Sequence, residues 1–517
     1  MIESVRIENL RSLTDTGFIN IKKINILLGA NSSGKSTFLR SFPLFTQSVK
    51  KNLRGPISWF DDSYVDFGDY QTAKNKYVDK EDSIRFSYSI CKPFIDVFYW
   101  RHTSYYYRQF QRHISNLEVS ISLGNDAKGT FVNKIDIILS GNTYSFSIPS
   151  REDYFCFQVN DGPFLYDSNW QWRHVSDRHI LPALVPVKSV EDEPYLQSYV
   201  RNLYDFAKKF CDTRFKNTER LKPLISLWDV DKKKYLKNLI EKASIPSFSK
   251  TAKTWDTETE DFLQIYNSAA FINVLDYLSI IDNELFVFYY RSDYIAPIRA
   301  EANRYYRSQG LQVNNIDSFG RNLQEFISSL TTKQKKSYND YTKKLLGLTV
   351  DTKIIAGHYS IVLRTDNGEF NMTDVGYGYS QIIPILTKLW FDSTTNRHDN
   401  FRYFYYEPEG VNLTLMEQPE LHLHPALQAK IADAFIELVT NTAEDVNPQR
   451  LIVETHSPTI INRIGRRIRE GNINSSDVNV VIFQKDKQQK NTIVKQIGFD
   501  NKGQLIDWPF GFLDPED

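Results

Sequence analysis

Cysteine is scarce in this chain, and its spacing excludes two classes of protein. The three cysteines, Cys91, Cys156 and Cys211, lie far apart in the sequence. Three isolated cysteines cannot form a disulfide framework, and no pair of Cys or His has the spacing of a zinc site. The sequence therefore predicts a protein of a reducing compartment, the cytoplasm.

Long hydrophobic runs are also missing. A membrane-spanning helix needs about eighteen or more consecutive apolar residues, and no stretch of the sequence provides them. The first residues, "MIESVRIENLRSL", carry acidic and polar side chains where a signal peptide needs an apolar segment. We expect a soluble, cytoplasmic protein with no membrane partner.

The chain has no excess of charge of either sign. Lys plus Arg and Asp plus Glu both number 63, so no overall electric field draws the protein to nucleic acid. Any such contact must come from a local basic patch. Because 41% of its residues are hydrophobic, the chain can form a buried core. A length of 517 residues predicts two or three structural units.

The patterning changes along the chain. Alternating apolar residues predict strands before residue 28, and a helix follows the glycine loop, where Pro43 should kink it or start a second helix. Short strands with polar turns between residues 83 and 175 predict an antiparallel β subdomain. Helical spacing dominates residues 190–345, and strands alternate with helices after residue 350. We therefore divide the chain into residues 1–185, 186–348 and 349–517.

The stretch "GANSSGKST" has the G-x-x-x-x-G-K-[ST] pattern of a phosphate-binding loop. Gly29, Gly34, Lys35 and Ser36 fill the pattern, between a predicted strand and a predicted helix. Backbone N–H groups of such a loop converge on an anion, the lysine reaches the β and γ phosphates, and the serine hydroxyl ligates Mg²⁺. The loop thus predicts ATP and Mg²⁺ as cofactors. The remaining residues assigned to cofactor binding here are Asn31, Ser33 and Thr37, the last being simply the next residue of the helix.

A phosphate loop needs an acidic residue at the end of a neighbouring buried strand. The best candidate lies far along the chain, where "LTLME" ends in Glu417, predicted to hold the metal with Ser36. The alternative is an ordinary carboxylate at a strand end. A second buried strand, "LIVE", leads into His456. A lone His is more often structural, but after a phosphate loop and an acidic strand we assign His456 to the catalytic set.

Together these motifs resemble the ABC-type ATPases of the RecF, SMC and OLD kind. The resemblance implies an α/β ATPase head with a mixed sheet and a P-loop, an antiparallel β subdomain, and a helical insertion between the N- and C-terminal lobes. Glu417 would be the Walker B acid and His456 the switch histidine. "DVGYGYSQ" would be the signature loop, contributing Gly376, Gly378, Ser380 and Gln381 to the cofactor site. The family also implies a head-to-tail dimer, with residues 421–425 at its seam.

One residue departs from the family pattern. The general-base Glu expected directly after the Walker B acid is replaced by Gln418, whose amide can orient water but cannot accept its proton. Glu420, two residues further on, is a candidate substitute. We include both in the catalytic set with Glu417, and we expect slow hydrolysis and a long-lived ATP-bound state.

The partner is predicted from resemblance alone. OLD-type proteins add a Toprim nuclease, but no D-x-D motif follows a buried strand after His456. The chain is similar to the ATPase subunits of Septu anti-phage systems, including retron-associated ones, which act with an HNH nuclease. The ATPase of PARIS systems, which holds a Toprim effector, is the next best match. The resemblance therefore implies an antiviral switch or scaffold for an effector nuclease.

A different possibility is a RecF-like ATPase that clamps duplex DNA in repair. It would need a basic face, or aromatic side chains that stack on bases, as "SYYYRQFQRH" at residues 104–113 could. The favoured interpretation of each basic run is a solvated helix face. The runs are Lys232, Lys233 and Lys234; Lys333, Lys335, Lys336, Lys343 and Lys344; and Arg466, Arg467 and Arg469.

Overall fold

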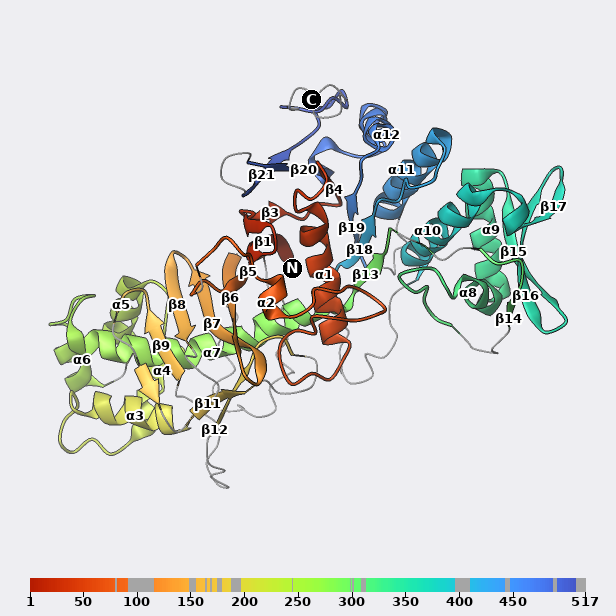
Figure 1. Ribbon diagram of the computed structural model, residues 1–517. Coiled ribbons are helices and arrows are strands. Elements are labelled where there is room, and N and C mark those ends of the chain that lie inside the picture. Colours follow the sequence, from red (N-terminus) through yellow and green to blue (C-terminus); the bar gives the residue numbers. More distant parts are fainter. Residues whose placement is uncertain are drawn as a thin grey trace. The chain divides into compact units, whose positions relative to one another are not determined.

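The computed structural model shows two compact units (Figure 1). One unit comprises residues 1–3, 52–56 and 83–286, and the other comprises residues 4–51, 57–82 and 287–517. The structure describes residues 1–79, 81–91, 116–147, 155–162, 165–167, 170–173, 179–186, 197–243, 245–297, 299, 302–307, 313–395, 410–441, 447–486 and 491–507. The aromatic run 104–113 and most of the C-terminal segment 507–517 therefore lie outside the described residues.

This division differs from the one predicted. The β subdomain and the helices up to residue 286 form one unit, whereas residues 287–348 belong with both ends of the chain. The difference arises because strand pairing and packing between distant segments define a unit, and neither can be read from local composition.

The first unit is built on an antiparallel sheet, as the alternating pattern predicted. Its strands follow one another in chain order from β5 to β10, and β11 pairs with β12 in a separate hairpin. The alternation buries one face of each strand, as along β7. The strands are β5 (Ile84–Cys91), β6 (Asn116–Asp126), β7 (Gly129–Leu139), β8 (Asn142–Ser147), β9 (Phe155–Val159), β10 (Leu165–Asp167), β11 (Trp170–Arg173) and β12 (Ala183–Pro186).

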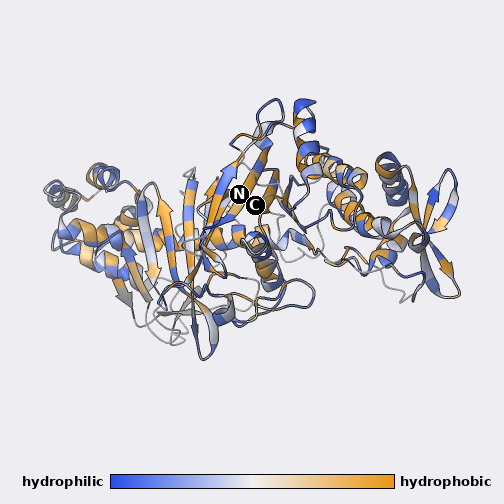
Figure 2. Ribbon diagram, turned by 45° about the horizontal axis from the view of Figure 1, so that its top comes forward, coloured by the Kyte–Doolittle hydropathy of each residue, from blue (hydrophilic) through white to orange (hydrophobic). Residues whose placement is uncertain are grey.

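Helices cover this sheet. The long helix α7 packs on it through Tyr266, whose hydroxyl lies 3.0 Å from that of Tyr144, and through Phe271 against Phe157. Apolar residues follow the helix in Figure 2. The helices of the unit are α3 (Gln197–Lys208), the 3₁₀ turn η2 (Thr218–Leu221), α4 (Pro223–Ser226), α5 (Lys232–Lys242), α6 (Pro246–Ala252) and all but the end of α7 (Glu260–Tyr290).

The second unit contains a six-stranded sheet that joins the two ends of the chain. Its order is β13-β18-β19-β4-β20-β21, parallel except for β21. The five parallel strands are nearly all buried, as expected for a parallel sheet covered on both faces, whereas most residues of β21 are not buried. The strands are β4 (Ile24–Gly29), β13 (Ser292–Ile295), β18 (Asn412–Glu417), β19 (Gln449–Glu454), β20 (Val478–Lys485) and β21 (Thr492–Ile497).

Smaller elements complete this unit. Strand β16 (His358–Thr365) pairs with β14 (Tyr306–Arg307), β15 (Thr349–Ile355) and β17 (Gly368–Asn371) in an antiparallel sheet. Separately, β1 (Ile2–Leu10, beginning in the first unit) pairs with β2 (Leu13–Asp15) and β3 (Ile19–Asn20). The helices are α1 (Lys35–Val49), α2 (Tyr70–Ala73), α8 (Leu323–Ser329), α9 (Thr332–Leu346), η3 (Met372–Asp374), α10 (Tyr377–Thr394), α11 (Pro425–Thr440), α12 (Pro458–Arg469) and η5 (Ser475–Asp477).

No second helix begins at Pro43, which was one of the two outcomes expected there. Helix α1 continues through the proline, although proline removes one helical hydrogen bond. Phe42, Leu44 and Phe45 around it are buried, so packing holds the helix together. Among the described helices, none combines the length and apolarity needed to cross a bilayer.

Candidate functional site

The loop between β4 and α1 depends on two glycines. A Cβ atom on Gly29 would lie 2.3 Å from the Phe483 carbonyl oxygen, and one on Gly34 would lie 2.6 Å from Cδ2 of Leu13. Gly34 also has a φ of 104°, which L side chains rarely adopt. Gly29 is therefore required by the close approach of a backbone carbonyl, and Gly34 by its positive φ and the nearby Leu13 side chain.

The N-terminus of α1 is suited to an anion. Gly34 caps the helix without a side-chain hydrogen bond, and the first turn carries no acidic residue. The N–H groups of this turn thus have no capping side chain, and the helix dipole favours negative charge there. The Ser33 hydroxyl is fully buried and has no hydrogen-bond partner in the structure. Asn31 is exposed, and Thr37 is half-buried in the first turn.

Lys35 turns back onto the loop. Its ammonium donates to the carbonyl oxygens of Gly29 and Ala30, both at 2.8 Å, and lies 3.9 Å from a carboxylate oxygen of Glu454. Only 3% of the side chain is exposed. Burial lowers the pKa of Lys35, against the opposing charge of Glu454.

The strand order confirms that the loop and the distant acidic strand share one sheet. Strand β19 pairs with β4 on one side and with β18 on the other. The carboxyl ends of these parallel strands therefore meet at one edge, where the register places Glu417 directly beside Glu454. Two carboxylates stand at this edge, whereas the sequence predicted one.

Glu454 is the carboxylate that faces the loop. Its Oε1 accepts a hydrogen bond from the Ser36 hydroxyl at 2.9 Å. Its Oε2 is buried and has no hydrogen-bond partner among the described residues. Burial and the neighbouring charge of Glu417 raise the pKa of Glu454 to about 6.

Glu417 is held from another direction. Both of its oxygens accept hydrogen bonds from the Arg40 guanidinium at 2.7 Å, and Oε1 also accepts one from the Tyr294 hydroxyl at 2.7 Å. The hydrogen bond with Glu417 raises the pKa of Arg40, and burial with the charge of Glu417 raises that of Tyr294. Ser36, which was predicted to share a metal with Glu417, is hydrogen-bonded to Glu454 instead.

The other residues assigned to catalysis lie at the same edge. Gln418 has a φ of 41° and donates its backbone N–H to the Glu454 carbonyl at 2.8 Å. Glu420 accepts the backbone N–H of His456 at 2.6 Å, and burial raises its pKa. The His456 ring is exposed, and partial shielding with the charge of Lys35 lowers its pKa. Glu420 thus fixes the backbone that carries the histidine.

The predicted signature loop opens helix α10. Gly376, with a φ of 96°, is its N-cap residue, and Gly378 lies against the side chain of Leu427. The Ser380 hydroxyl donates to the Tyr377 carbonyl within the helix at 2.6 Å. Gln381 is also buried.

Sequence reasoning missed Glu454, Arg40, Tyr294 and the buried Arg299, whose Nε donates to Oε1 of Gln381 at 3.2 Å. Burial lowers the pKa of Arg299 to about 10. Glu454 gave the same signal as Glu417, an acid closing a buried apolar strand. Arg299 and Tyr294 gave no chemical signal in the sequence.

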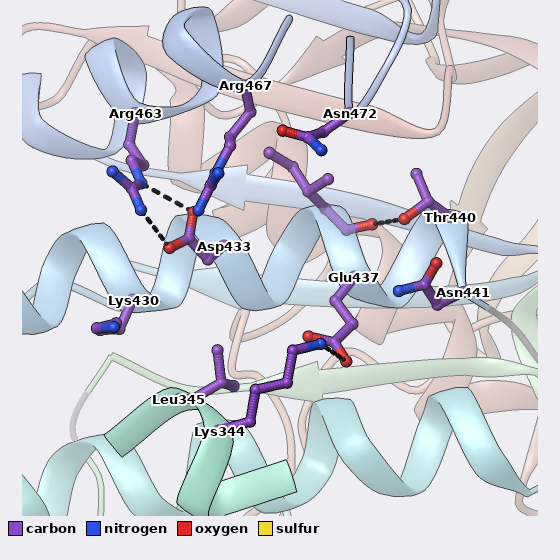
Figure 3. A pocket seen from close by; sticks show the side chains of 11 residues that line it. Lys344, Leu345, Lys430, Asp433, Glu437, Thr440, Asn441, Arg463, Arg467 and Asn472 are labelled. Atoms are coloured by element: carbon purple, nitrogen blue, oxygen red, sulfur yellow. Dashed lines mark hydrogen bonds and ion pairs between the residues drawn. The ribbon is translucent and has the colours of Figure 1, made fainter. Parts of the chain in front are cut away.

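The basic runs lie on helices, and six of their eleven residues form ion pairs with acids. Figure 3 shows a groove between α9, α11 and α12 in which Arg463 and Arg467 both contact Asp433. Lys344 contacts Glu437 across the same groove at 2.9 Å. Lys234 and Lys335 are also paired, with Asp229 and Asp351. Such pairing is typical of solvated helix faces.

The family model described as "AAA ATPase domain" matches residues 1–461. No curated protein matches the chain in sequence. A solved Smc head bound to the C-winged helix domain of ScpA is 9% identical, with 97% of this chain and 98% of that chain covered and a TM-score of 0.35. The Pyrococcus furiosus Smc head with an extended coiled coil, bound to the C-terminal domain of ScpA, is 11% identical, covers 96% of both chains and has a TM-score of 0.35.

The SMC head domain from Thermotoga maritima is 6% identical, with 96% of this chain and 98% of that chain covered and a TM-score of 0.34. These scores are too low to support an argument about the fold, which rests instead on the strand order described above.

Proposed function

The chain belongs to the AAA ATPase domain family, and we propose that it binds ATP with Mg²⁺ where β4, β18 and β19 end. The observation that carries the proposal is the convergence of a glycine loop, an uncapped helix N-terminus, a buried lysine and two carboxylates at one sheet edge. Ligands of parallel α/β sheets bind at the carboxyl ends of the strands.

The residues at this edge fit a nucleotide phosphate. The N–H groups at the start of α1 and the partnerless Ser33 hydroxyl offer donors to phosphate oxygens. In the proposed complex the Lys35 ammonium exchanges its bonds to the loop carbonyls for bonds to phosphate. Neutral His456 supplies a ring nitrogen that could contact the terminal phosphate.

The same edge fits a divalent cation. Mg²⁺ usually takes one or two carboxylates together with waters and substrate phosphate oxygens. Here the Ser36 hydroxyl, Glu454 and Glu417 are the candidate protein groups, and Glu454 has a buried oxygen without a partner. When bound, Mg²⁺ would neutralise phosphate charge.

We further propose that hydrolysis is slow. Gln418 follows the strand at the usual position of the general base, and its amide accepts no proton. One oxygen of Glu420 accepts the His456 backbone N–H, and the other is buried and has no hydrogen-bond partner among the described residues. Its proposed role is to position the histidine.

A slowly hydrolysing, ATP-bound state suits a switch. We propose a head-to-tail dimer completed by Gly376, Gly378 and the start of α10, and a partner effector nuclease of the HNH or Toprim kind. Resemblance to Septu and PARIS ATPases supports this part. The internal pairing of the basic helix faces gives the alternative of a DNA-repair clamp no support.

Steady-state phosphate release tests the enzymatic proposal. The wild-type chain should turn over well below about 10 s⁻¹, the median for enzymes, and Gln418→Glu should be at least about tenfold faster. Lys35→Met should show no turnover above background. Fast wild-type turnover, or no gain from Gln418→Glu, would contradict the assigned role of the glutamine.

Co-expression with a candidate effector nuclease of the HNH or Toprim kind tests the switch. The nuclease should co-purify with the wild-type chain in Mg-ATP and to a lesser degree with Lys35→Met. Co-purification that is equal in both, or absent in both, would refute nucleotide control of the partner.

A further inference from the structure

We propose that Glu454, and not Glu417, is the carboxylate that joins Ser36 in holding the divalent cation of the bound nucleotide. This inference rests on the proposed function and changes the assignment of its metal site. It makes the strand between the phosphate loop and the Walker B-like strand the source of the metal-facing acid.

Hydrogen bonding separates the two carboxylates. Glu454 already contacts the Ser36 hydroxyl, the group that a phosphate loop offers to the metal. Strand β19, which carries Glu454, is also the direct neighbour of β4, whereas β18 is one strand further away. Ser36 and Glu454 therefore form a preassembled pair of oxygen donors.

Charge compensation separates them as well. Arg40 neutralises Glu417 through a bidentate pair, and Tyr294 occupies Oε1 in addition. Among the described residues, Glu454 forms no comparable ion pair. The Lys35 ammonium lies 3.9 Å from its carboxylate and donates its two short hydrogen bonds to loop carbonyls. A buried carboxylate without a close cation is costly, and a bound cation removes that cost.

The unsatisfied oxygen points to a ligand. Oε2 of Glu454 is buried without a hydrogen-bond partner, in a side chain that is 4% exposed. Carboxylate oxygens are among the donors that Mg²⁺ and Mn²⁺ prefer.

Fluorescent ATP binding, measured in EDTA and in Mg²⁺, tests the assignment. The wild-type chain should bind the nucleotide at least about tenfold more tightly with Mg²⁺. Glu454→Gln keeps an acceptor for the Ser36 hydroxyl but removes the negative charge. It should therefore bind the nucleotide no more tightly in Mg²⁺ than in EDTA. In EDTA it should bind the nucleotide as tightly as wild type, or more tightly. Glu417→Gln is the matched control and should retain the gain.

A second measurement follows the metal itself. Mn²⁺ bound in the presence of a non-hydrolysable ATP analogue, detected by electron paramagnetic resonance, should fall at least about tenfold in affinity in Glu454→Gln and Ser36→Ala. Thermal unfolding verifies that each variant is folded. If Glu454→Gln does not fold, Glu454→Asp, which keeps the charge but shortens the reach, replaces it and should bind Mn²⁺ more weakly.

The outcomes are separable. If wild type binds no nucleotide, or Lys35→Met binds as well as wild type, the proposed function fails. If wild type binds and gains from Mg²⁺ but Glu454→Gln or its replacement keeps the whole gain, the inference alone is overturned. Loss of the gain in Glu417→Gln and not in the Glu454 variants would restore Glu417 as the metal-facing acid.

Discussion

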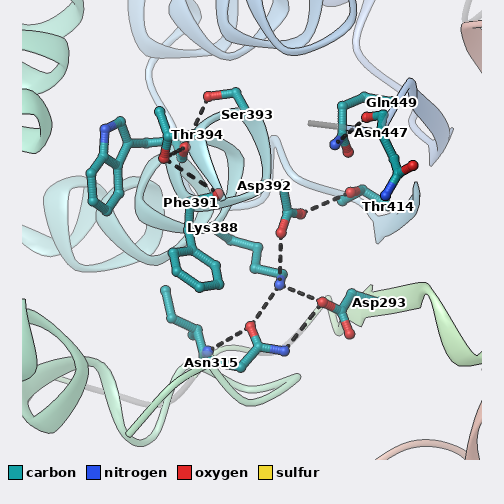
Figure 4. A network of polar contacts seen from close by, with 12 residues as sticks. Asp293, Asn315, Lys388, Phe391, Asp392, Ser393, Thr394, Thr414, Asn447 and Gln449 are labelled. Carbon is teal, nitrogen blue, oxygen red and sulfur yellow. Dashed lines mark hydrogen bonds and ion pairs between the residues drawn. The ribbon is translucent and has the colours of Figure 1, made fainter. Parts of the chain in front are cut away.

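Two buried lysines in the same unit have different surroundings. Lys388, in α10, is 2% exposed and contacts Asp293, Asp392 at 2.9 Å and Asn315 at 2.7 Å (Figure 4). Lys35 is equally buried, yet its closest contacts are loop carbonyls, and the nearest carboxylate is 3.9 Å away.

The difference shows which network supports the fold and which one is suited to a ligand. The Lys388 network extends through Asp392 to the Thr414 hydroxyl at 2.9 Å and thereby ties α10 to the central strands. The Lys35 network instead contains adjacent carboxylates, a partnerless Glu454 oxygen and a partnerless Ser33 hydroxyl. A stabilising network pairs its charges, whereas a binding site leaves some of them for the ligand.

The largest expected effect comes from substituting the two lysines in the same way. Lys388→Met removes the cation that contacts both Asp293 and Asp392, leaving Lys50 3.7 Å from Asp293, and should lower the free energy of unfolding by about 3–5 kcal/mol. Lys35→Met removes a charge that lacks a close carboxylate, and should change the free energy of unfolding by about 1 kcal/mol. Urea denaturation without nucleotide measures both. Equal destabilisation would break the contrast between the two networks.

A smaller effect follows from the pKa of Glu454. In the unfolded chain the Glu454 carboxyl has a pKa near 4.5, whereas in the folded chain its pKa is raised to about 6. The folded state therefore binds more protons in this window, and stability falls as pH rises through it. In EDTA, the free energy of unfolding of the wild type should fall by about 2 kcal/mol between pH 4 and pH 7, relative to that of Glu454→Gln.

Urea titrations of both variants across this range supply the measurement. Saturating concentrations of Mg²⁺ and ATP should restore most of the free energy of unfolding that the wild type loses at pH 7, because the cation compensates the Glu454 charge. A difference between wild type and Glu454→Gln that does not vary with pH would show that the Glu454 charge carries no penalty in the folded chain.

The smallest effect concerns the groove in Figure 3. Arg463 and Arg467 both pair with Asp433, and they are 23% and 28% exposed. Although burial opposes them, the two guanidinium groups lower the pKa of Asp433. Asp433→Asn should cost about 1 kcal/mol or less at pH 7 and low salt, and less still in high salt. A loss comparable to that of Lys388→Met would mean that exposure does not distinguish these networks.

Strong local patterns predicted the elements that carry the site. "NLTLME" forms β18 from Asn412 to Glu417, and the glycine loop joins a strand to a helix as expected. An acid at the end of a buried strand is visible in one dimension. The shared sheet could be proposed because phosphate loops require such an acid nearby.

Interactions between distant segments could not be predicted in this way. Arg40 and Glu417 pair across most of the chain, and nothing local in α1 identifies that partner. The Ser36–Glu454 bond depends on β19 lying between β4 and β18, which is a property of sheet order. Helix α1 continues past Pro43 for a related reason, because tertiary packing outweighs a local preference.

Isothermal titration of Mg-ATP into the wild-type chain and into Lys35→Met tests the central claim most directly. We predict one saturable site per wild-type chain and at least about a hundredfold weaker binding by Lys35→Met. The unfolding midpoints of the two chains should agree closely. Equal binding by the two chains, or no binding by the wild type, would contradict it.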